Sequence, residues 1–519
     1  MLPEPGASPT DPASSPPAIA GPGLPAGWAV ALVFFTSAAI LVLEIVAGRL
    51  LAPIIGESLE TYTAVIGTVL AGIAAGNAIG GVMADRSRPE RLLGPVLILG
   101  GVTSWLAPLI AGVFSEPVTP SPVVIVLLTA LTFLAPATVL ATVTPLVAAL
   151  LIDDVGRAGR VVGKLSAVGT AGALLGTFGT GFILVVHFPT RRIVVGVGLL
   201  LVLGGIATIV GLARAAGTSP MEGRNAPAAL AGIAVVGFGS WWAPDPCTLE
   251  TPYVCVDLQA DPEPPNGIAV VLDGVRNSYV VPDDPTHLEF RYLRLFRDVT
   301  TAHVGPPDAP TEAAADGVDV LHIGGAGFSF PRSVRAAWGD AAAQTVLEVD
   351  DQLVDVARDR LGLETDEQLE VLTGDARLTI RELATDRYDV VVGDAFSGYT
   401  VPWQLTTRQY VAEIDRVLAP DGVIALNLID GGPLDFVRAE LATLAETFDH
   451  VAIIVPADSD VLGGPSRNQV VLASHRPLPA ITVDPADGVV LDEAATAELI
   501  GDAQILDDDF APVDQLRTG

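Results

Sequence analysis

The chain has 519 residues, of which half are hydrophobic, and its formal net charge is −32 at pH 7. The hydrophobic and charged residues separate: the first 245 residues carry 11 basic and 12 acidic side chains, and the remainder carries 17 and 48. This separation predicts a membrane half and an acidic soluble half, and it argues against nucleic-acid binding, which needs clustered Lys and Arg.

Residues 1–25 are rich in Pro, Ser, Ala and Gly, which predicts a disordered tail. Residues 26–245 hold seven apolar segments, most of them about 20 residues long and able to cross roughly 30 Å of hydrocarbon. The fourth segment contains Pro136 and Pro145, so we expect it to be kinked, tilted or broken. The seven candidate spans in the lipid bilayer are 28–52, 62–84, 92–114, 122–152, 161–187, 193–213 and 227–243.

Basic residues indicate how the spans are oriented. They gather in three loops on one side of the membrane, which the positive-inside rule makes cytoplasmic, although Arg191 and Arg192 lie on the other side. With seven spans the soluble half is extracytoplasmic, and with six or eight it is cytoplasmic. The loop residues are Arg86, Arg88, Arg91, Arg157, Arg160, Lys164, Arg214 and Arg224.

Cys247 and Cys255 follow the last span, and their spacing matches no metal motif. In an oxidising compartment they could form a disulfide, and in the cytosol they would be buried thiols. Glu44 lies deep in the first span, where it either pairs with an arginine such as Arg49 or marks a functional site.

The second span ends in GGVMADR, which resembles the loop after the second helix of major-facilitator transporters. Glycines in the second and fifth spans are typical of closely packed membrane helices. A transporter therefore remains an alternative interpretation of the membrane half.

Residues 246–304 are predicted to form a small β region, with strands at 252–257 and 267–282, followed by a helix at 287–303. From residue 305 to 519 strands alternate with amphipathic helices, which predicts a doubly wound parallel sheet of the Rossmann type. We expect strands at 318–323, 344–349, 369–372, 388–393, 422–428, 450–455 and 468–474, and helices at 330–338, 351–361, 376–384, 405–418 and 432–447.

Ligands of such sheets bind at the carboxyl ends of the strands. The first of these strands is followed by Gly324, Gly325 and Gly327, which allow a ligand to approach the backbone at a helix N-terminus. Glu348 ends the second strand, where an acid commonly binds ribose hydroxyls. The sequence therefore predicts a nucleotide site at this edge of the sheet.

Two aspartates follow the next strands. Asp375 comes after the third strand, where it either faces an adenine amino group or caps a helix. Asp394 comes after the fourth strand, where it either takes a proton beside the reacting centre or caps a turn.

These motifs, in this order, resemble the spermidine synthase family of polyamine aminopropyltransferases, and especially its prokaryotic members that are fused to membrane helices. VVLDGV is similar to the hairpin LxLDG of the family, LEFRY to DEFxY, and VLHIGGAG to VLxIGGGDG; LEVD, GDAR and YDVVVGDAFS follow. The resemblance covers roughly residues 265–475 and implies a methyltransferase-type Rossmann domain with a small N-terminal β-hairpin region.

The resemblance also implies a reaction. An aminopropyl group would pass from decarboxylated S-adenosylmethionine, as co-substrate, to an amine, without a metal or a tightly bound cofactor. Asp394 would act as the base, Glu348 would bind ribose, Asp375 would bind adenine, and Tyr292 would help to shape the amine pocket. Relatives of the soluble fold commonly pair, so a homodimer is an option that the sequence leaves open.

Two positions depart from the family pattern. The family has an Asp where this chain has Gly327, and a second Asp of its DxxD motif where this chain has Ser397. Each missing acid would remove hydrogen bonds to a charged ligand, each worth about 1.5–3 kcal/mol. We therefore expect an altered substrate, and an S-adenosylmethionine-dependent methyltransferase or a transporter with a nucleotide-sensing domain are the alternative functions.

Overall fold

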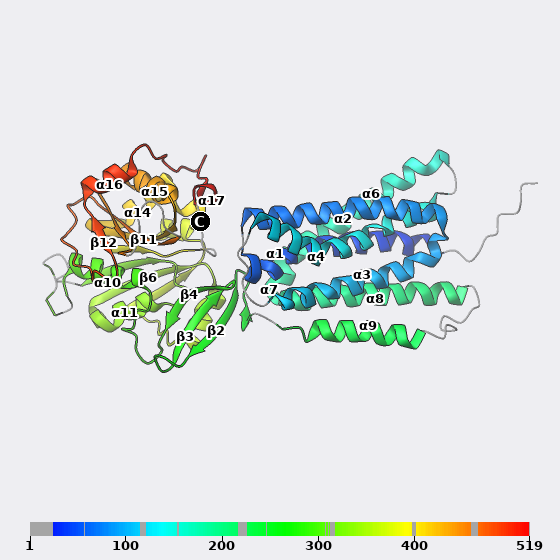
Figure 1. Ribbon diagram of the computed structural model, residues 1–519, viewed down its shortest axis with the longest axis horizontal. Helices are drawn as coiled ribbons and strands as arrows, with labels where there is room; N and C mark the ends of the chain where they lie inside the picture. Colours follow the sequence, from blue (N-terminus) through cyan, green and yellow to red (C-terminus); the bar gives the residue numbers. More distant parts are fainter. Residues whose placement is uncertain are drawn as a thin grey trace, which may run out of the picture.

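The computed structural model describes residues 24–56, 58–114, 121–152, 155–215, 226–244, 247–306, 308–309, 311, 317–396, 401–457 and 466–517. They form an elongated helical bundle with an α/β half at one end (Figure 1). Nearly all of the predicted disordered tail, together with Arg224 and Ser397, lies outside the described residues.

Among the described residues, six helical segments are long and apolar enough to cross a membrane. They are α1 (Ala26–Ile55), α2 (Leu59–Arg86), α3 (Pro89–Val113), α4 (Pro122–Ala141) with α5 (Val143–Leu151), α6 (Ala158–Gly179) with η2 (Thr180–Leu184) and α7 (Val185–His187), and α8 (Thr190–Ala215). The short helix η1 (Val155–Arg157) precedes α6.

The predicted seventh span forms a helix, α9 (Ala226–Trp241), that is too short to count as a membrane span by the same criterion. Its 16 residues extend about 24 Å, whereas the hydrocarbon core is roughly 30 Å thick. In the part of the chain that the structure describes, six segments and not the predicted seven are therefore long and apolar enough to be membrane spans.

The fourth predicted span is interrupted at Thr142, between α4 and α5. Pro145 has no N–H to donate to the carbonyl of Ala141, so the helical hydrogen-bond ladder cannot run through this point. The expectation of a broken or kinked helix is confirmed.

The glycines of the second and fifth spans bring helix backbones together, as expected. A methyl group added at Gly76 of α2 would collide with the carbonyl of Thr138 in α4, and one added at Gly172 of α6 would collide with the carbonyl of Phe34 in α1. Arg49 pairs with Glu250 of the soluble half, where its Nη2 atom lies 3.1 Å from Glu250 Oε1, and the pairing of Glu44 with an arginine stays a prediction.

The soluble half begins with a sheet of four described strands in the order β1 (Leu249–Glu250), β2 (Cys255–Asp261), β3 (Gly267–Leu272) and β4 (Val275–Val280), all antiparallel. Asp273 and Gly274 make the tight turn between β3 and β4, with φ of 47° and 80°. The Asp273 Oδ1 atom accepts a hydrogen bond of 2.9 Å from the Cys255 N–H, which ties the turn to β2.

The larger sheet has eight described strands in the order β12-β10-β11-β9-β8-β5-β6-β7. Their bounds are β5 (Val318–Ile323), β6 (Ala342–Glu348), β7 (Leu369–Thr373), β8 (Tyr388–Gly393), β9 (Leu418–Asp430), β10 (His450–Val455), β11 (Arg467–Ser474) and β12 (Val489–Leu491). Strands β5 to β9 are parallel, as predicted, but β11 is antiparallel to β9 and β10, and β12 is antiparallel to β10. A fully parallel sheet was therefore the wrong expectation.

Helices cover both faces of this sheet. One face packs against α10 (Arg291–Val304) and α11 (Ser329–Trp338), and the other packs against α14 (Arg408–Val417) and α15 (Asp435–Ala445). The remaining helices are α12 (Asp351–Arg360), α13 (Ala376–Thr379), α16 (Glu493–Ile500) and α17 (Val513–Leu516), with short turns η4 (Gly339–Ala341), η5 (Ile380–Glu382) and η6 (Trp403–Leu405).

The strand order creates a switch point between β5 and β8. From β5 the chain continues to β6 and β7 on one side, and then returns to β8 on the other side of β5. Loops after the two strands therefore diverge, and ligands of doubly wound sheets bind at this point. The glycine turn follows β5, and Asp394 follows β8.

Candidate functional site

Asp394 is held by hydrogen bonds from two elements. The Tyr292 Oη atom of α10 donates to Asp394 Oδ2 at 2.9 Å, and the Asn427 Nδ2 atom of β9 donates to Oδ1 at 2.8 Å. Burial raises the pKa of Asp394, and the two donors oppose this rise because they favour the charged form. The structure thus brings Tyr292 and Asp394 together, and their roles as amine-pocket residue and base stay predictions.

Tyr292 is suited to remain a donor. Its burial, followed by the charge of Asp394, raises the pKa of its hydroxyl well above the ordinary value of 10. The phenol therefore keeps its proton at neutral pH, and its ring stacks on Phe290 with 5.8 Å between the ring centroids.

Asn427 and Asn468 are site residues that the sequence analysis missed. The Asn468 Nδ2 atom of β11 donates to Asn427 Oδ1 at 3.0 Å, so the Asn427 amide presents its Nδ2 atom to Asp394. The available signal was a lone amide in the otherwise apolar run VIALNLI, which is unusual for a buried strand.

The glycine turn lies directly against the backbone after β8. Gly324 has a φ of 94°, and a Cβ atom at this position would lie 2.5 Å from the carbonyl oxygen of Asp394. The Asp394 N–H donates to the Ile323 carbonyl at 2.8 Å, which holds the two strand ends together. Only glycine satisfies both the backbone angle and the close approach.

Glu348 at the end of β6 faces the same turn. Its Oε2 atom accepts hydrogen bonds from the N–H groups of Gly325 and Ala326 at 2.8 and 3.1 Å, and its Oε1 atom accepts one from Asp350 N at 3.0 Å. Burial raises the pKa of Glu348, and these three donors counteract it. The structure therefore brings Glu348 and the glycine turn together, and Oε1 keeps capacity for one more hydrogen bond.

Gly327 has no room for the acid that the family carries at this position. A Cβ atom on Gly327 would lie 2.7 Å from the Cβ atom of Ser278 in β4, and the Gly327 N–H donates to Ser278 Oγ at 3.2 Å. Because the small sheet packs against the turn at this point, a side chain at position 327 would collide with β4, and this packing explains the departure from the family pattern. Ser397, the other departure, lies outside the described residues.

Asp375 is exposed and caps a helix. Its Oδ1 atom accepts a hydrogen bond of 2.9 Å from Arg377 N in the first turn of α13. This is one of the two roles expected from the sequence. Binding of adenine by the second carboxylate oxygen stays a prediction.

A narrow cavity of about 20 Å³ reaches Asp394 from the side of α10. Its lining includes Tyr292, Gly324 and the ring of His322. Burial lowers the pKa of His322 to about 4, so the ring is neutral and contributes no positive charge beside Asp394. The cavity has room for a group the size of one amine nitrogen or one water molecule.

No family model matches the chain. It is 29% identical over 110 residues to a polyamine aminopropyltransferase from Vibrio vulnificus, covering 21% of this chain and 36% of the relative. It is 31% identical over 165 residues to polyamine aminopropyltransferase 2 from Streptomyces coelicolor, covering 27% and 30%. An N-terminal histidine N-methyltransferase from Emericella nidulans is 26% identical over 206 residues, covering 38% and 35%.

The chain thus spans about a third of the length of these curated relatives. Among solved structures, a probable spermidine synthase from Corynebacterium glutamicum has a TM-score of 0.46 at 24% identity, covering 50% of this chain and 95% of that chain. Human methyltransferase-like protein 13 has a TM-score of 0.32 at 19% identity, covering 44% and 99%.

Proposed function

The soluble half of this chain is related to the spermidine synthase family, and on that premise we propose that the chain is a membrane-anchored transferase. It would move a group from an adenosyl-sulfonium donor, of the decarboxylated S-adenosylmethionine type, to an amine. The observation that carries this proposal is the contact between the glycine turn and the Asp394 backbone, with Tyr292 and Asn427 donating to the Asp394 carboxylate.

In the proposed reaction the amine lone pair attacks the carbon next to the sulfonium, and the carbon–sulfur bond breaks to leave a neutral thioether. Asp394 takes the proton that the amine loses, while Glu348 and the glycine turn hold the donor. The sulfonium charge and the cationic amine both suit an acidic domain. A small cationic amine and the lipid bilayer are the partners that we propose, and a homodimer stays a prediction.

A second candidate is methyl transfer from S-adenosylmethionine, which the similarity to a histidine N-methyltransferase favours. The purified full-length chain should therefore be incubated with either donor and a panel of amines. We expect methylthioadenosine to appear with the decarboxylated donor. Release of S-adenosylhomocysteine instead would establish the methyltransferase, and donor binding without turnover with any amine would favour a nucleotide-sensing transporter.

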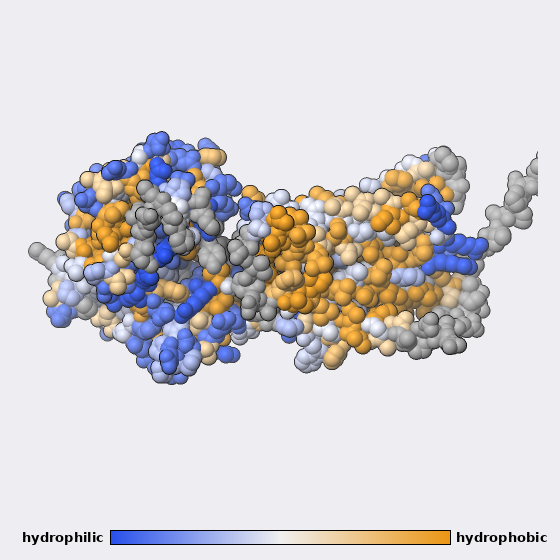
Figure 2. Space-filling view, viewed as in Figure 1, coloured by the Kyte–Doolittle hydropathy of each residue, from blue (hydrophilic) through white to orange (hydrophobic). Residues whose placement is uncertain are grey.

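We also propose that the soluble half is extracytoplasmic, because α9, although shorter than a full membrane span, packs along α3 and α8 and returns the chain from the far end of the bundle to the soluble half (Figure 1). Helices α1 and α8 meet the soluble half through Arg49 and Thr190, so the α2–α3 and α5–α6 loops lie at the far end of the bundle. Figure 2 shows hydrophilic residues at that end, where the positive-inside rule places the cytoplasm. The Cys247–Cys255 pair is disulfide-bonded, which suits an oxidising compartment.

Reporter fusions test this orientation. Alkaline phosphatase fused after Gly519 is expected to be active and green fluorescent protein at the same place to be dark, with the reverse result for fusions in the loop after Arg86. Fluorescence at the C-terminus would place the soluble half in the cytoplasm. An extracytoplasmic site also requires a donor that reaches the outer side, so the donor test should be repeated on intact cells.

A further inference from the structure

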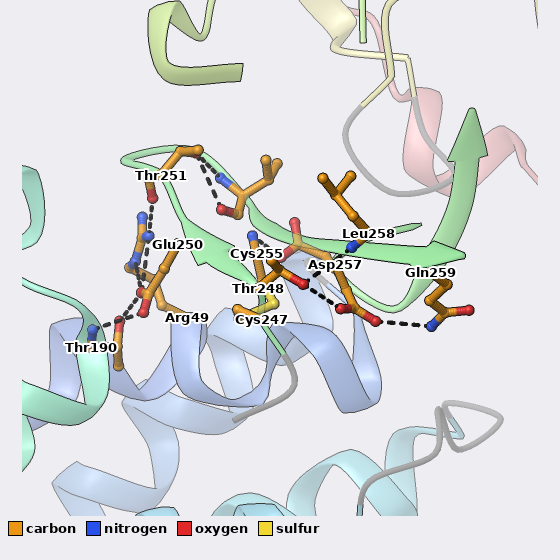
Figure 3. The surroundings of a disulfide bond; sticks show 12 residues. Arg49, Thr190, Cys247, Thr248, Glu250, Thr251, Cys255, Asp257, Leu258 and Gln259 are labelled. Atoms are coloured by element: carbon orange, nitrogen blue, oxygen red, sulfur yellow. Dashed lines mark hydrogen bonds and ion pairs between the residues drawn. A yellow bond between two sulfur atoms is a disulfide. The ribbon is translucent and has the colours of Figure 1, made fainter. Parts of the chain in front are cut away.

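The segment from Cys247 to Cys255, which we call the junction loop, connects the bundle to the soluble half. Its two ends are joined by the disulfide, and its strand β1 pairs with the first two residues of β2, Cys255 and Val256. Figure 3 shows Glu250 and Thr251 on the side of the loop that faces Arg49 and Thr190 of the bundle. The loop is therefore a closed element that both halves contact.

The bundle holds the junction loop by charge and by backbone contacts. The Arg49 Nη2 and Nε atoms lie 3.1 and 3.3 Å from Glu250 Oε1, and Thr190 N donates to Glu250 Oε2 at 2.8 Å. Arg49 also donates to the carbonyl oxygens of Thr251 and Pro252. The Arg49 and Glu250 side chains are only 15% and 13% exposed, so water screens the pair less than it screens a surface ion pair.

The other side of the loop contacts the site. The Thr251 hydroxyl donates to Asp350 Oδ2 at 2.5 Å, and both residues are buried. The other oxygen of Asp350 caps α12, where it accepts from Gln352 N and Leu353 N. The Asp350 N–H donates to Glu348 Oε1, and Glu348 in turn holds the glycine turn.

We propose that Arg49 and Thr251 are positioning residues of the adenosyl site, so that the membrane bundle fixes the Glu348 carboxylate through the junction loop. This inference rests on the proposed function only for the identity of the ligand. The bundle is then part of the donor site, and a displacement of α1 or α8 would reach the glycine turn through Thr251 and Asp350.

Thr251 is the critical link because its hydroxyl has several partners. Besides donating to Asp350, its oxygen accepts hydrogen bonds from Tyr253 N at 3.1 Å and Val254 N at 2.9 Å. Removal of the hydroxyl leaves a buried carboxylate oxygen of Asp350 without this donor, which is costly for a charged group. Asp350 would then shift, and its N–H would leave Glu348.

The chain offers matched controls for both residues. Thr248 also lies in the junction loop, but it is exposed and its hydroxyl donates to Asp257 Oδ1 at 2.7 Å (Figure 3). Arg192 is exposed at the same end of the bundle as Arg49. Thr248→Val and Arg192→Gln therefore make the same chemical changes, but they leave the contacts from Arg49 to Thr251 and from Thr251 to Asp350 intact.

Amide hydrogen exchange of residues 324–328 in the full-length chain, in detergent and without ligand, tests the inference. We expect exchange of the Gly325 and Ala326 amides to be about ten-fold faster in Arg49→Gln and Thr251→Val. Thr251→Ser and both controls should exchange at the wild-type rate. Wild-type exchange rates in Thr251→Val and Arg49→Gln would overturn the inference. An equally large acceleration of exchange in β8 and β9 would also overturn it, because the proposed effect is confined to the glycine turn.

Donor binding gives a second measurement. In Thr251→Val we expect a dissociation constant about ten-fold higher, while kcat at saturating donor stays unchanged. A change in kcat with unaltered donor affinity would contradict a positioning role. Failure of the wild-type chain to bind any adenosyl donor would instead contradict the proposed function, and the exchange measurement would still decide the coupling.

Discussion

Asp394→Asn is expected to lower the rate of transfer by about 10²- to 10⁴-fold, the usual contribution of a general base, while the donor still binds. The amide has nearly the shape of the carboxylate, but it cannot take the proton of the attacking amine. The partners Tyr292 and Asn427 both donate to this position, so one of the two donors would face the new NH₂ group. Single-turnover kinetics and donor titration on the same sample separate the two effects.

Asp386→Asn is the matched control. Asp386 is exposed just before β8, at the end of this strand that lies away from Asp394, and its φ of 51° is one that Asn tolerates. This variant should transfer at the wild-type rate. If Asp394→Asn retained more than about a tenth of the wild-type rate, Asp394 would not be the base.

The pH dependence of the same reaction follows from the environment of Asp394. Burial raises its pKa above the ordinary carboxyl value of 3.8, and the carboxylate must be ionised to take a proton. The rate should therefore rise with pH through this raised pKa. Tyr292→Phe removes a hydrogen bond that favours the charged form, so it should move the acid limb of the profile to higher pH. An unmoved acid limb would assign that limb to another group.

Gly324→Ala is expected to abolish donor binding and to lower the free energy of unfolding by at least about 1–3 kcal/mol. The added methyl group would lie 2.5 Å from the Asp394 carbonyl oxygen, on a residue whose φ is 94°. Neither backbone can move away unless the ends of β5 and β8 separate, and these ends carry the glycine turn and the base. Thermal unfolding and calorimetric titration with the donor measure the two losses.

Ala326→Gly provides the opposite change two residues further along the same turn. Ala326 has a φ of 44°, which glycine adopts more readily, so we expect the wild-type donor affinity and a stability change of less than about 1 kcal/mol. Wild-type donor affinity in Gly324→Ala would show that the close approach of the two strand ends is not needed for binding.

Local sequence patterns predicted much of the architecture because they follow from short-range physics. Apolar length identified six helical segments that are long and apolar enough to cross a membrane, and the alternation of strands and helices identified the doubly wound sheet. The direction of β11 could not be predicted in this way, because a strand has the same periodicity whether it is parallel or antiparallel to its neighbours. The seventh span was overestimated for another reason: the apolar composition of α9 is that of a membrane span, but its helix has only 16 residues.

The sequence by itself determined which residues lie at the strand ends, because glycine turns and acids are recognisable where a buried strand stops. It therefore identified Gly324, Glu348 and Asp394 before their contacts were known. Only the tertiary structure decided what these residues touch. Asn427 meets Asp394 through the pairing of β9 with β8, and Asn468 joins them through the antiparallel β11.

The junction between the two halves shows the same division most clearly. The charges of Arg49 and Glu250 are visible in the sequence, but 201 residues separate them, and Thr251 is 99 residues from Asp350. Hydrogen bonds and ion pairs act over a few ångströms, so which groups pair depends on how the chain is packed in space. Composition determined that this chain has an apolar half and an acidic half, and tertiary packing decided which residues of the two halves meet at the junction loop.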